Sequence, residues 1–251
     1  MFTKSAAFYD AIYSFKDYVT ESERVHHLIE THIDGPSARL LDVGCGTGAH
    51  SIHLQQHYHI TGIDLDENIL AEARKRLPNA TLLQADMLNF ELGQQFDAII
   101  CLFGVIAYAQ TVEGMAQVAA HLYRHLRPGG VALVEPFIYL SDYRVGHVGV
   151  DQVEADGAKI VRMSHIATDD PVPLTAATTI SLDFHYLIGR AEGVTHEQEI
   201  HRMVMATRED YQQALSSVGF NVSYDEQGLM GRGLFICKRN GTARQPSVDL
   251  A

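Results

Sequence analysis

The pattern of apolar and polar residues changes several times along this chain of 251 residues. Residues 5–32 place apolar side chains three or four positions apart, which predicts helix. Over residues 36–140 short apolar runs alternate with helical segments, as in a parallel sheet with helices on both faces. Residues 141–205 instead alternate apolar and polar positions in several stretches, which predicts antiparallel strands. Residues 206–239 then predict a helix and a hairpin.

The elements can be placed more closely. The five strands of the parallel sheet are expected at residues 40–42, 60–63, 81–87, 96–103 and 131–135. The helix before the fifth of these strands has Thr111 as its cap and is expected to stop at Arg127-Pro128-Gly129-Gly130. The antiparallel strands are expected at residues 159–167, 177–188 and 196–206, and the hairpin at 221–226 and 234–238, after a helix from Thr207 to Gly219.

These elements predict an α/β fold, a Rossmann-like doubly wound sheet with a carboxyl-terminal antiparallel hairpin and an inserted antiparallel β lid. Residues 1–35 would form a helical cap over a cofactor cleft, residues 36–140 and 206–239 the core, and residues 141–205 a substrate lid. Residues 240–251 read as a disordered tail. Because loops and insertions at the carboxyl ends of the strands line the cleft of such a sheet, the lid is expected to hold the substrate.

A glycine-rich loop follows the first predicted strand and is the strongest sequence signal. The run Leu-Leu-Asp-Val-Gly-Cys-Gly-Thr-Gly occupies residues 40–48. Its glycines let the backbone turn tightly and approach a ligand closely. Gly44-x-Gly46-x-x-Ala49 also satisfies the dinucleotide fingerprint, so the loop alone leaves an NAD site open.

Three acids at strand ends decide between the cofactors. Asp42 stands where it would attract an ammonium group and repel a diphosphate, which favours S-adenosylmethionine (SAM). Asp64, 20 residues after Gly44, is placed to bind ribose hydroxyls, although NAD sites share this feature. Asp86 is suited to accept a hydrogen bond from an adenine amino group while Met87 packs on the ring. The glycine loop, the three acids and the later strands follow one another from Leu40 to Glu135. In this order of elements the chain resembles the class I SAM-dependent methyltransferases.

The composition of the chain limits the class of substrate that is expected. The net charge of −12 argues against a nucleic-acid partner, because such binding depends on Lys and Arg. The three cysteines lie in or beside predicted strands without paired spacing, and no long apolar run or signal peptide is found. A cytoplasmic protein without membrane contact and with a small-molecule substrate is therefore expected. No metal is expected, because the helical pairs His53/His57 and His121/His125 lack the further ligand and base of zinc helices.

Segments beyond the core resemble a narrower family, the N,N-dimethyltransferases that act on TDP-linked amino sugars such as those of desosamine and mycaminose. The similar segments, in order, are Lys16-Asp17-Tyr18, residues 73–78, 134–137, 162–165, 185–186, 199–202 and 231–235. The chain departs from the family's pattern at Phe137-Ile138, at Met230 and near Val105. These positions are expected to face the substrate, so the departures affect which acceptor is used.

The resemblance implies a set of binding residues. The cofactor contacts are expected at Tyr9, Tyr18, Asp42, Gly44, Cys45, Gly46, Asp64, Leu65, Asp86, Met87 and Leu102. Substrate contacts are expected at Phe137, Tyr139, His165 and Arg232. Arg232 is the candidate for a diphosphate, because a guanidinium binds phosphate oxygens through two parallel hydrogen bonds. A homodimer is possible on this reading.

Methyl transfer from a sulfonium chiefly requires the acceptor to be aligned with the methyl group. Tyr108, Glu135 and His201 are the candidates to take the proton from an amine acceptor. The alternatives are a methyltransferase for another small amine or hydroxyl acceptor of natural-product metabolism, a protein that keeps the fold without turnover, and an NAD-dependent oxidoreductase.

Overall fold

A seven-stranded mixed sheet forms the core of the protein, in a computed structural model that describes residues 8–171 and 174–241. Its strands, in spatial order, are β10 (Asn221–Asp225), β11 (Leu234–Lys238), β5 (Leu126–Val134), β4 (Phe96–Cys101), β1 (Arg39–Val43), β2 (His59–Asp64) and β3 (Thr81–Gln84). The strands β1 to β5 run parallel, and β11 pairs antiparallel with both β5 and β10. The predicted Rossmann-like sheet and its closing hairpin are confirmed.

Helices cover both faces of this sheet. On one face, α5 (Val112–His125) and α6 (Arg208–Ser216) bury residues such as Met115, Leu122 and Tyr211 against β4 and β5. On the other face, α2 (Tyr18–His32) and α3 (Ser51–Leu54) pack Val25, Ile29 and Leu54 on the sheet, and α4 (Glu67–Arg76) packs beside β2 and β3. Apolar residues three and four positions apart give each helix one buried stripe.

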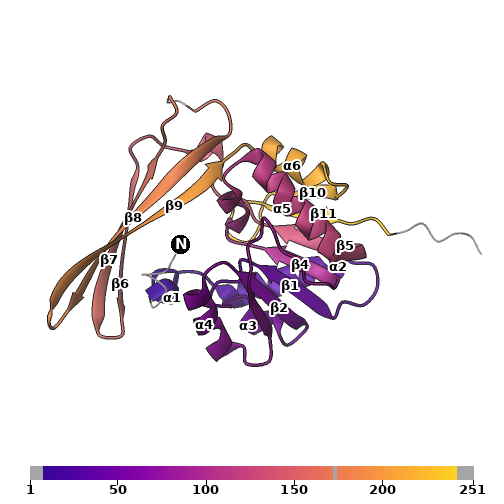
Figure 1. Ribbon diagram of the computed structural model, residues 1–251, viewed down its shortest axis with the longest axis horizontal. Helices are drawn as coiled ribbons and strands as arrows, with labels where there is room; N and C mark the ends of the chain where they lie inside the picture. The colour runs from indigo at the N-terminus through magenta and orange to yellow at the C-terminus, as the bar shows by residue number, and fades with distance from the viewer. Residues whose placement is uncertain (1–7, 172–173, 242–251) are drawn as a thin grey trace, which may run out of the picture.

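A second, four-stranded antiparallel sheet stands beside the core (Figure 1). Its strands are β6 (Val148–Ala155), β7 (Ala158–Ala167), β8 (Thr178–Arg190) and β9 (Gly193–Met205). The face toward the core is buried, whereas the outer face is exposed, as the alternating burial along β8 requires of a sheet with one solvated side. The inserted antiparallel sheet is thus confirmed, and it has one strand more than we predicted.

The additional strand, β6, was not predicted because its apolar residues do not keep to one face. Val148 and Val150 lie on the outer face and Val153 and Ala155 on the inner one, so the period-2 pattern breaks halfway. Pairing with all eight partners on β7 holds the strand despite this.

Three predicted boundaries in the core are corrected. The third strand ends at Gln84 and the fourth at Cys101, so Asp86, Met87, Leu102 and Phe103 lie in loops rather than strands. The helix before the fifth strand ends at His125, and β5 already begins at Leu126. Leu126 already pairs with Phe96 of β4, so the chain leaves the helix before it reaches the proline at 128.

The amino-terminal segment forms two helices rather than one. The helix α1 (Tyr9–Ile12) is separated from α2 by residues 13–17, and the side chain of Asp17 caps α2 by accepting the amide of Thr20. Figure 1 shows α1 between the lid and the core. Phe8, Ile12 and Tyr13 pack on Phe184 and Tyr186 of the lid. The tail predicted from residue 240 lies almost entirely outside the described residues.

Candidate functional site

Two adjoining hollows open where the strands of the parallel sheet end and the lid begins. The first measures about 580 Å³ and the second about 410 Å³. They share five lining residues, Tyr9, Gly44, Gly46, Val105 and Tyr108. Volumes of this size are typical of small-molecule sites. Because the walls are shared, the hollows can be filled by two ligands in contact.

The glycine loop forms the floor between the hollows. Gly44 and Gly46 have φ of +71° and +55°, a left-handed backbone that favours glycine. The amides of Gly44 and Cys45 donate to the carbonyl of Ile63 at 2.8 and 3.0 Å. A Cβ on Gly44 would overlap the side chain of Val105, so the loop packs directly against the segment after β4.

Asp42, at the end of β1, presents a buried carboxylate to the second hollow. The Ser51 hydroxyl donates to its Oδ2 at 2.7 Å, yet burial raises the pKa of Asp42 from its ordinary value of 3.8 to about 6. This carboxylate is 5% exposed and lies among Gly44, Cys45 and His50 in the hollow's lining. A cationic ligand would offset the cost of burying its charge.

Asp64 and Asp86 line the first hollow. Both oxygens of Asp64 accept backbone amides, from Gly46 at 2.9 Å and from Asp66 at 3.0 Å, so this carboxylate also fixes the glycine loop. Burial is the main cause that raises its pKa, against the lowering effect of those amides. Asp86 accepts the amide of Leu88 at 2.9 Å. Each carboxylate retains lone pairs for hydroxyl or amino donors.

Every cofactor residue expected from the sequence lines one of the two hollows. Those in the first hollow include Asp64, Leu65, Asp86 and Met87. Those in the second include Tyr18, Asp42, Cys45 and Leu102, and Tyr9, Gly44 and Gly46 belong to both.

The cap is fixed to the glycine loop by contacts that the sequence did not reveal. Asp10 of α1 accepts a hydrogen bond from the Thr47 hydroxyl at 2.7 Å and pairs with Arg76 of α4. Tyr9 is thereby held over the loop at the boundary of both hollows.

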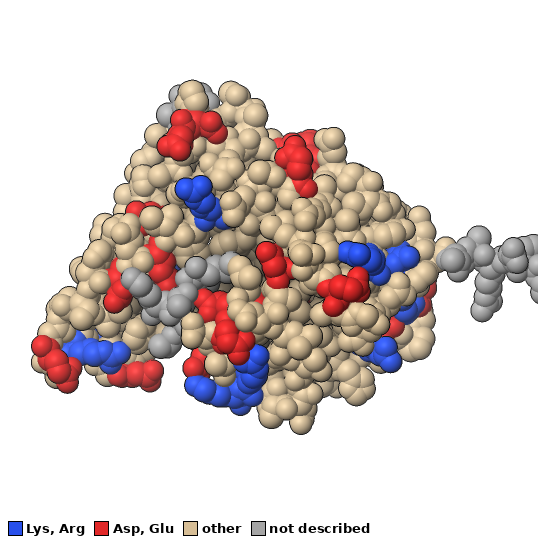
Figure 2. Space-filling view, in the orientation of Figure 1, with Lys and Arg blue, Asp and Glu red and all other residues tan. Residues whose placement is uncertain are grey.

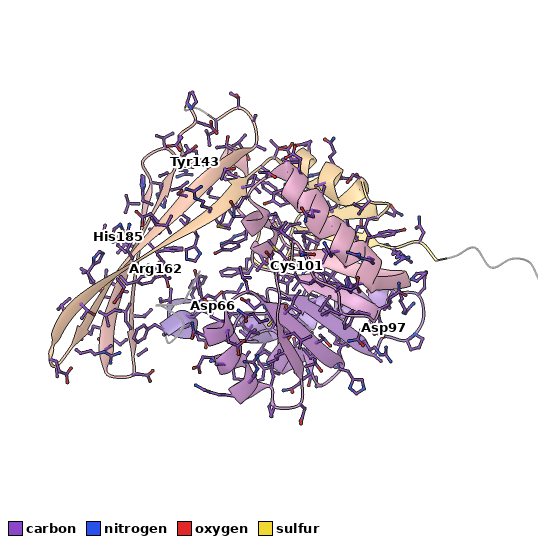
Figure 3. The ribbon with its side chains drawn as sticks, in the orientation of Figure 1. Asp66, Asp97, Cys101, Tyr143, Arg162 and His185 are labelled. Atoms are coloured by element: carbon purple, nitrogen blue, oxygen red, sulfur yellow. The ribbon has the colours of Figure 1, made fainter. Side chains whose placement is uncertain are left out.

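The lid is joined to the cap by a buried arginine on β7. Arg162 donates to the Tyr13 hydroxyl at 2.8 Å and to Asp151 of β6 at 2.6 and 2.9 Å. Its guanidinium also lies 4.9 Å from the ring centres of Tyr13 and Phe184. Figure 3 labels Arg162 on the lid, facing the core. The sequence does hold a signal for this contact. Arg162 is a charged residue at an inward-facing position of a strand in which polar and apolar residues alternate.

The residues expected to contact the acceptor divide into two groups. Phe137 and Arg232 line the second hollow, together with Ile138. Tyr139 does not; its hydroxyl bonds that of Tyr224 at 2.9 Å, and it lines a separate surface hollow. His165 lies on the exposed face of β7, and its neighbour Ser164 faces the second hollow instead.

Arg232 is the half-buried cation of the second hollow. Its guanidinium lies 5.5 Å from the ring centre of Phe103, and among the residues that the structure describes no carboxylate pairs with it. Lys16 approaches the same ring to 4.2 Å but is neutralised by Glu21 at 2.9 Å. The arginine is therefore available to an anionic ligand.

Glu135, predicted as a candidate base, lies behind the wall of the site. It is fully buried, and its Oε2 accepts the amide of Phe103 at 2.6 Å. Its Oε1 has no hydrogen-bond partner in the described part of the chain, and burial raises the pKa of Glu135. Phe103 has φ of +55°, a strained conformation for a residue with a side chain. The carboxylate thus holds the strained turn after β4 and contributes to neither hollow's lining.

The other two predicted catalytic residues are brought together. Tyr108, in the short helix η2 (Val105–Ala109), and His201 on β9 join through a hydrogen bond of 2.7 Å between the phenol oxygen and Nδ1. Both line the first hollow, and Tyr108 also lines the second.

No group of three metal-ligating side chains occurs within residues 8–171 and 174–241, and no helix in those ranges is long and apolar enough to cross a bilayer. On the face shown in Figure 2, basic side chains stand in small groups among acidic ones. A nucleic-acid backbone would require a broad basic surface instead.

The hollows fit SAM. A buried carboxylate suits the ammonium of its amino-acid part, and the acids at 64 and 86 suit hydroxyl and amino donors. Leu65, Ile69 and Met87 provide apolar surface for a purine. Three carboxylates around the loop would repel the diphosphate of a dinucleotide.

Comparison with known proteins agrees with this geometry. A methyltransferase domain family matches residues 40–130. The dTDP-3-amino-3,4,6-trideoxy-α-D-glucopyranose N,N-dimethyltransferase of Streptomyces venezuelae is 35% identical over 88% of this chain and 91% of its own. The crystal structure of S. venezuelae DesVI superposes with a TM-score of 0.84 at 33% identity, covering 94% of this chain and 98% of that one.

The SAM-bound structure of CalS10, an amino pentose methyltransferase from Micromonospora echinaspora, superposes with a TM-score of 0.79. It is 35% identical and covers 92% of this chain and 96% of its own. With a methyltransferase domain match and relatives of this identity along most of its length, this protein belongs to the family of SAM-dependent methyltransferases that includes the N,N-dimethyltransferases of nucleotide-linked amino sugars.

Proposed function

We propose that this enzyme transfers the methyl group of SAM to the amine of a nucleotide-linked amino sugar. The observation that carries the proposal is Arg232, a half-buried guanidinium without a carboxylate partner, in a chain with a net charge of −12. A diphosphate would supply the two acceptor oxygens that a guanidinium binds best. The names of the relatives support the same class of acceptor.

In this proposal the cofactor and the acceptor bind mainly in different hollows. The cofactor would fill the first hollow and reach across the glycine loop to the Asp42 side of the second, and when bound it supplies an activated methyl group and its leaving group. Asp42 would hold the ammonium, Asp64 the ribose and Asp86 the adenine amino group. The acceptor would occupy the rest of the second hollow, with Arg232 on its phosphates and Phe137 and Ile138 on its apolar part.

The protein's main contribution is then alignment. Tyr9, Val105 and Tyr108 line both hollows, so they would fix the distance and angle between amine and methyl group. Alignment of this kind can lower the barrier by about 7 to 11 kcal/mol. We further propose that residues 1–35 act as a cap over the cofactor and residues 141–205 as a lid over the acceptor, because Tyr13 and Arg162 connect the two.

The direct test compares two acceptors. Release of S-adenosylhomocysteine is measured with dTDP-3-amino-3,4,6-trideoxy-α-D-glucopyranose and with the same amino sugar lacking its nucleotide. We expect turnover with the first and weak or no saturation with the second. Arg232→Ala should raise the KM for the nucleotide-linked sugar at least tenfold, because a charge-assisted pair contributes about 1.5 to 3 kcal/mol. The SAM affinity should change little.

Arg39→Ala is the matched control, since Arg39 is an exposed arginine at the opposite end of β1. It should leave both acceptors unaffected. Equal use of both acceptors by the wild type, or an equal effect of Arg232→Ala on both, would contradict the proposal. The second candidate, a methyltransferase for another small amine or hydroxyl, would then be favoured, because Phe137 and Ile138 give the second hollow an apolar wall.

Two further proposals concern the protein in the cell. All three cysteines are buried free thiols, which is the state expected in a reducing compartment such as the cytoplasm. A homodimer is proposed from the family resemblance, and sedimentation velocity tests it.

A further inference from the structure

The catalytic candidates Tyr108 and His201 belong to a three-residue chain that includes an unassigned carboxylate, Glu199. The imidazole of His201 is hydrogen-bonded through Nδ1 to Tyr108, and its Nε2 lies 3.8 Å from Oε2 of Glu199, an ion-pair distance. Glu199 and His201 are two positions apart on β9, so both project from the same face of the lid sheet. They are 6% and 2% exposed.

The packing around His201 fixes its ring. Phe184 meets the imidazole edge to face with ring centres 5.2 Å apart, and Tyr108 approaches it at 5.7 Å. A ring held on two sides keeps Nδ1 directed at the phenol and Nε2 toward Glu199. This arrangement separates the roles of the two nitrogens.

We propose that Tyr108, His201 and Glu199 form a proton-transfer chain that carries the amine's proton away from the acceptor, with Tyr108 as the catalytic contact and Glu199 as a positioning residue. The proposal rests on the methyltransferase function argued above and adds the route of the proton. Tyr108 is suited to the first position because it lines both hollows and so borders the place where amine and methyl group meet.

The proton leaves the amine in the same step that transfers the methyl group. The amine lone pair forms the C–N bond while the C–S bond of the cofactor breaks, and the amine proton passes to the Tyr108 oxygen as the charge on nitrogen grows. The Tyr108 proton moves at the same time to Nδ1 of His201. The products are a neutral methylated amine, a neutral thioether, an intact phenol and an imidazolium that faces the Glu199 carboxylate.

The buried setting of Tyr108 favours passage of the proton through its neutral hydroxyl over formation of a phenolate. Burial raises the pKa of Tyr108 well above its ordinary value, so the phenol stays protonated and accepts a proton only as it donates its own. For this, Nδ1 must be the unprotonated nitrogen, and the carboxylate beside Nε2 favours that tautomer.

The test uses single-turnover methyl transfer with dTDP-3-amino-3,4,6-trideoxy-α-D-glucopyranose at saturating SAM and acceptor. Tyr108→Phe should lower the rate about 100-fold, the lower end of the range for general acid–base catalysis. Glu199→Gln should lower it roughly 10- to 100-fold, and the double variant should be no slower than Tyr108→Phe alone, because one break already disables a chain. The KM values and the SAM affinity should stay within about threefold.

Two controls match the substitutions. Tyr123→Phe removes a phenol from α5, outside both hollows, and Glu154→Gln removes an exposed carboxylate from the lid. Both should keep the wild-type rate. A structural role for the Tyr108 hydroxyl, in which it only holds the lid on the core, predicts instead a lower melting temperature and a higher KM at an unchanged saturated rate. That result, or losses that multiply in the double variant, would overturn the proposal.

A second measurement does not depend on the acceptor. Nitrogen-15 NMR of the SAM complex, with the His201 signals assigned by their loss in His201→Gln, reports the tautomer. We expect Nε2–H in the wild type and a larger Nδ1–H fraction in Glu199→Gln. An Nδ1–H tautomer in the wild type would overturn the chain even if the enzyme methylates amino sugars. Failure of the wild type to release S-adenosylhomocysteine with any nucleotide-linked amine would instead overturn the proposed function.

Discussion

Asp42 is expected to lower the stability of the ligand-free protein while it favours cofactor binding. The size of the destabilisation follows from the burial of its carboxylate. The pKa of this carboxyl is raised from 3.8 to about 6 because it is buried at the end of β1. One pKa unit corresponds to about 1.4 kcal/mol. Ionised Asp42 therefore destabilises the ligand-free protein by about 3 kcal/mol.

The sign of the pH dependence follows from linkage. A carboxyl whose pKa is higher in the folded state binds protons more tightly there, so its effect is absent below pH 3.8 and grows as pH rises to about 6. Asp42→Asn should thus have the wild-type free energy of unfolding near pH 3.5 and exceed it by about 3 kcal/mol at pH 8. Asn retains an oxygen that can accept the Ser51 hydroxyl.

Binding should show the opposite effect. In the proposed site the ammonium of SAM pairs with the ionised carboxylate of Asp42, so wild-type affinity should fall up to about tenfold for each pH unit below 6 and binding there should release one proton. Asp42→Asn should bind SAM weakly at every pH without releasing that proton.

Urea unfolding and calorimetry in two buffers of different ionisation enthalpy measure both effects. A stability difference that is the same at pH 3.5 and pH 8, or wild-type SAM affinity in the Asn variant, would refute this reasoning. Asp97 is the matched control at the other end of the sheet (Figure 3). Burial raises its pKa, but the amides of Ala38 and Arg39 and the Arg127 guanidinium outweigh this and lower it overall, so Asp97→Asn should destabilise the protein near neutral pH.

Three further predictions concern other contacts. Asp64→Asn should weaken SAM binding at least tenfold in calorimetry, because bonds to a charged acceptor contribute about 1.5 to 3 kcal/mol; NADH binding without SAM binding would contradict the assignment. Arg162→Ala should lower the free energy of unfolding by about 2 kcal/mol through the lost bonds to Asp151 and Tyr13, with Arg162→Lys restoring little of it. Thr207→Ala should lower it by about 1 kcal/mol in urea unfolding, since Thr207 and Asp210 form the capping box of α6; unchanged SAM affinity would confirm that only the helix end is affected.

The proposed cofactor half of the site was predictable from sequence because its parts are local. The glycine loop follows an apolar strand directly, and the acids at 42, 64 and 86 lie at or just beyond the ends of neighbouring parallel strands, so the sheet brings them to one edge. The period-2 pattern likewise predicted the lid. It missed β6, where apolar residues occupy both faces and pairing with β7 along the whole strand holds it in the sheet.

The proposed acceptor half of the site was decided by the tertiary structure, because its contacts join residues far apart in the chain. Tyr108 and His201 are separated by 93 positions, and Tyr13 and Arg162 by 149. No local pattern specifies which side chains meet when a lid sheet packs on a core, or that Glu135 turns behind Phe103 while Tyr139 turns to Tyr224. Residue type and strand position therefore determined the candidates, and the packing of lid, cap and core determined which of them face the two hollows.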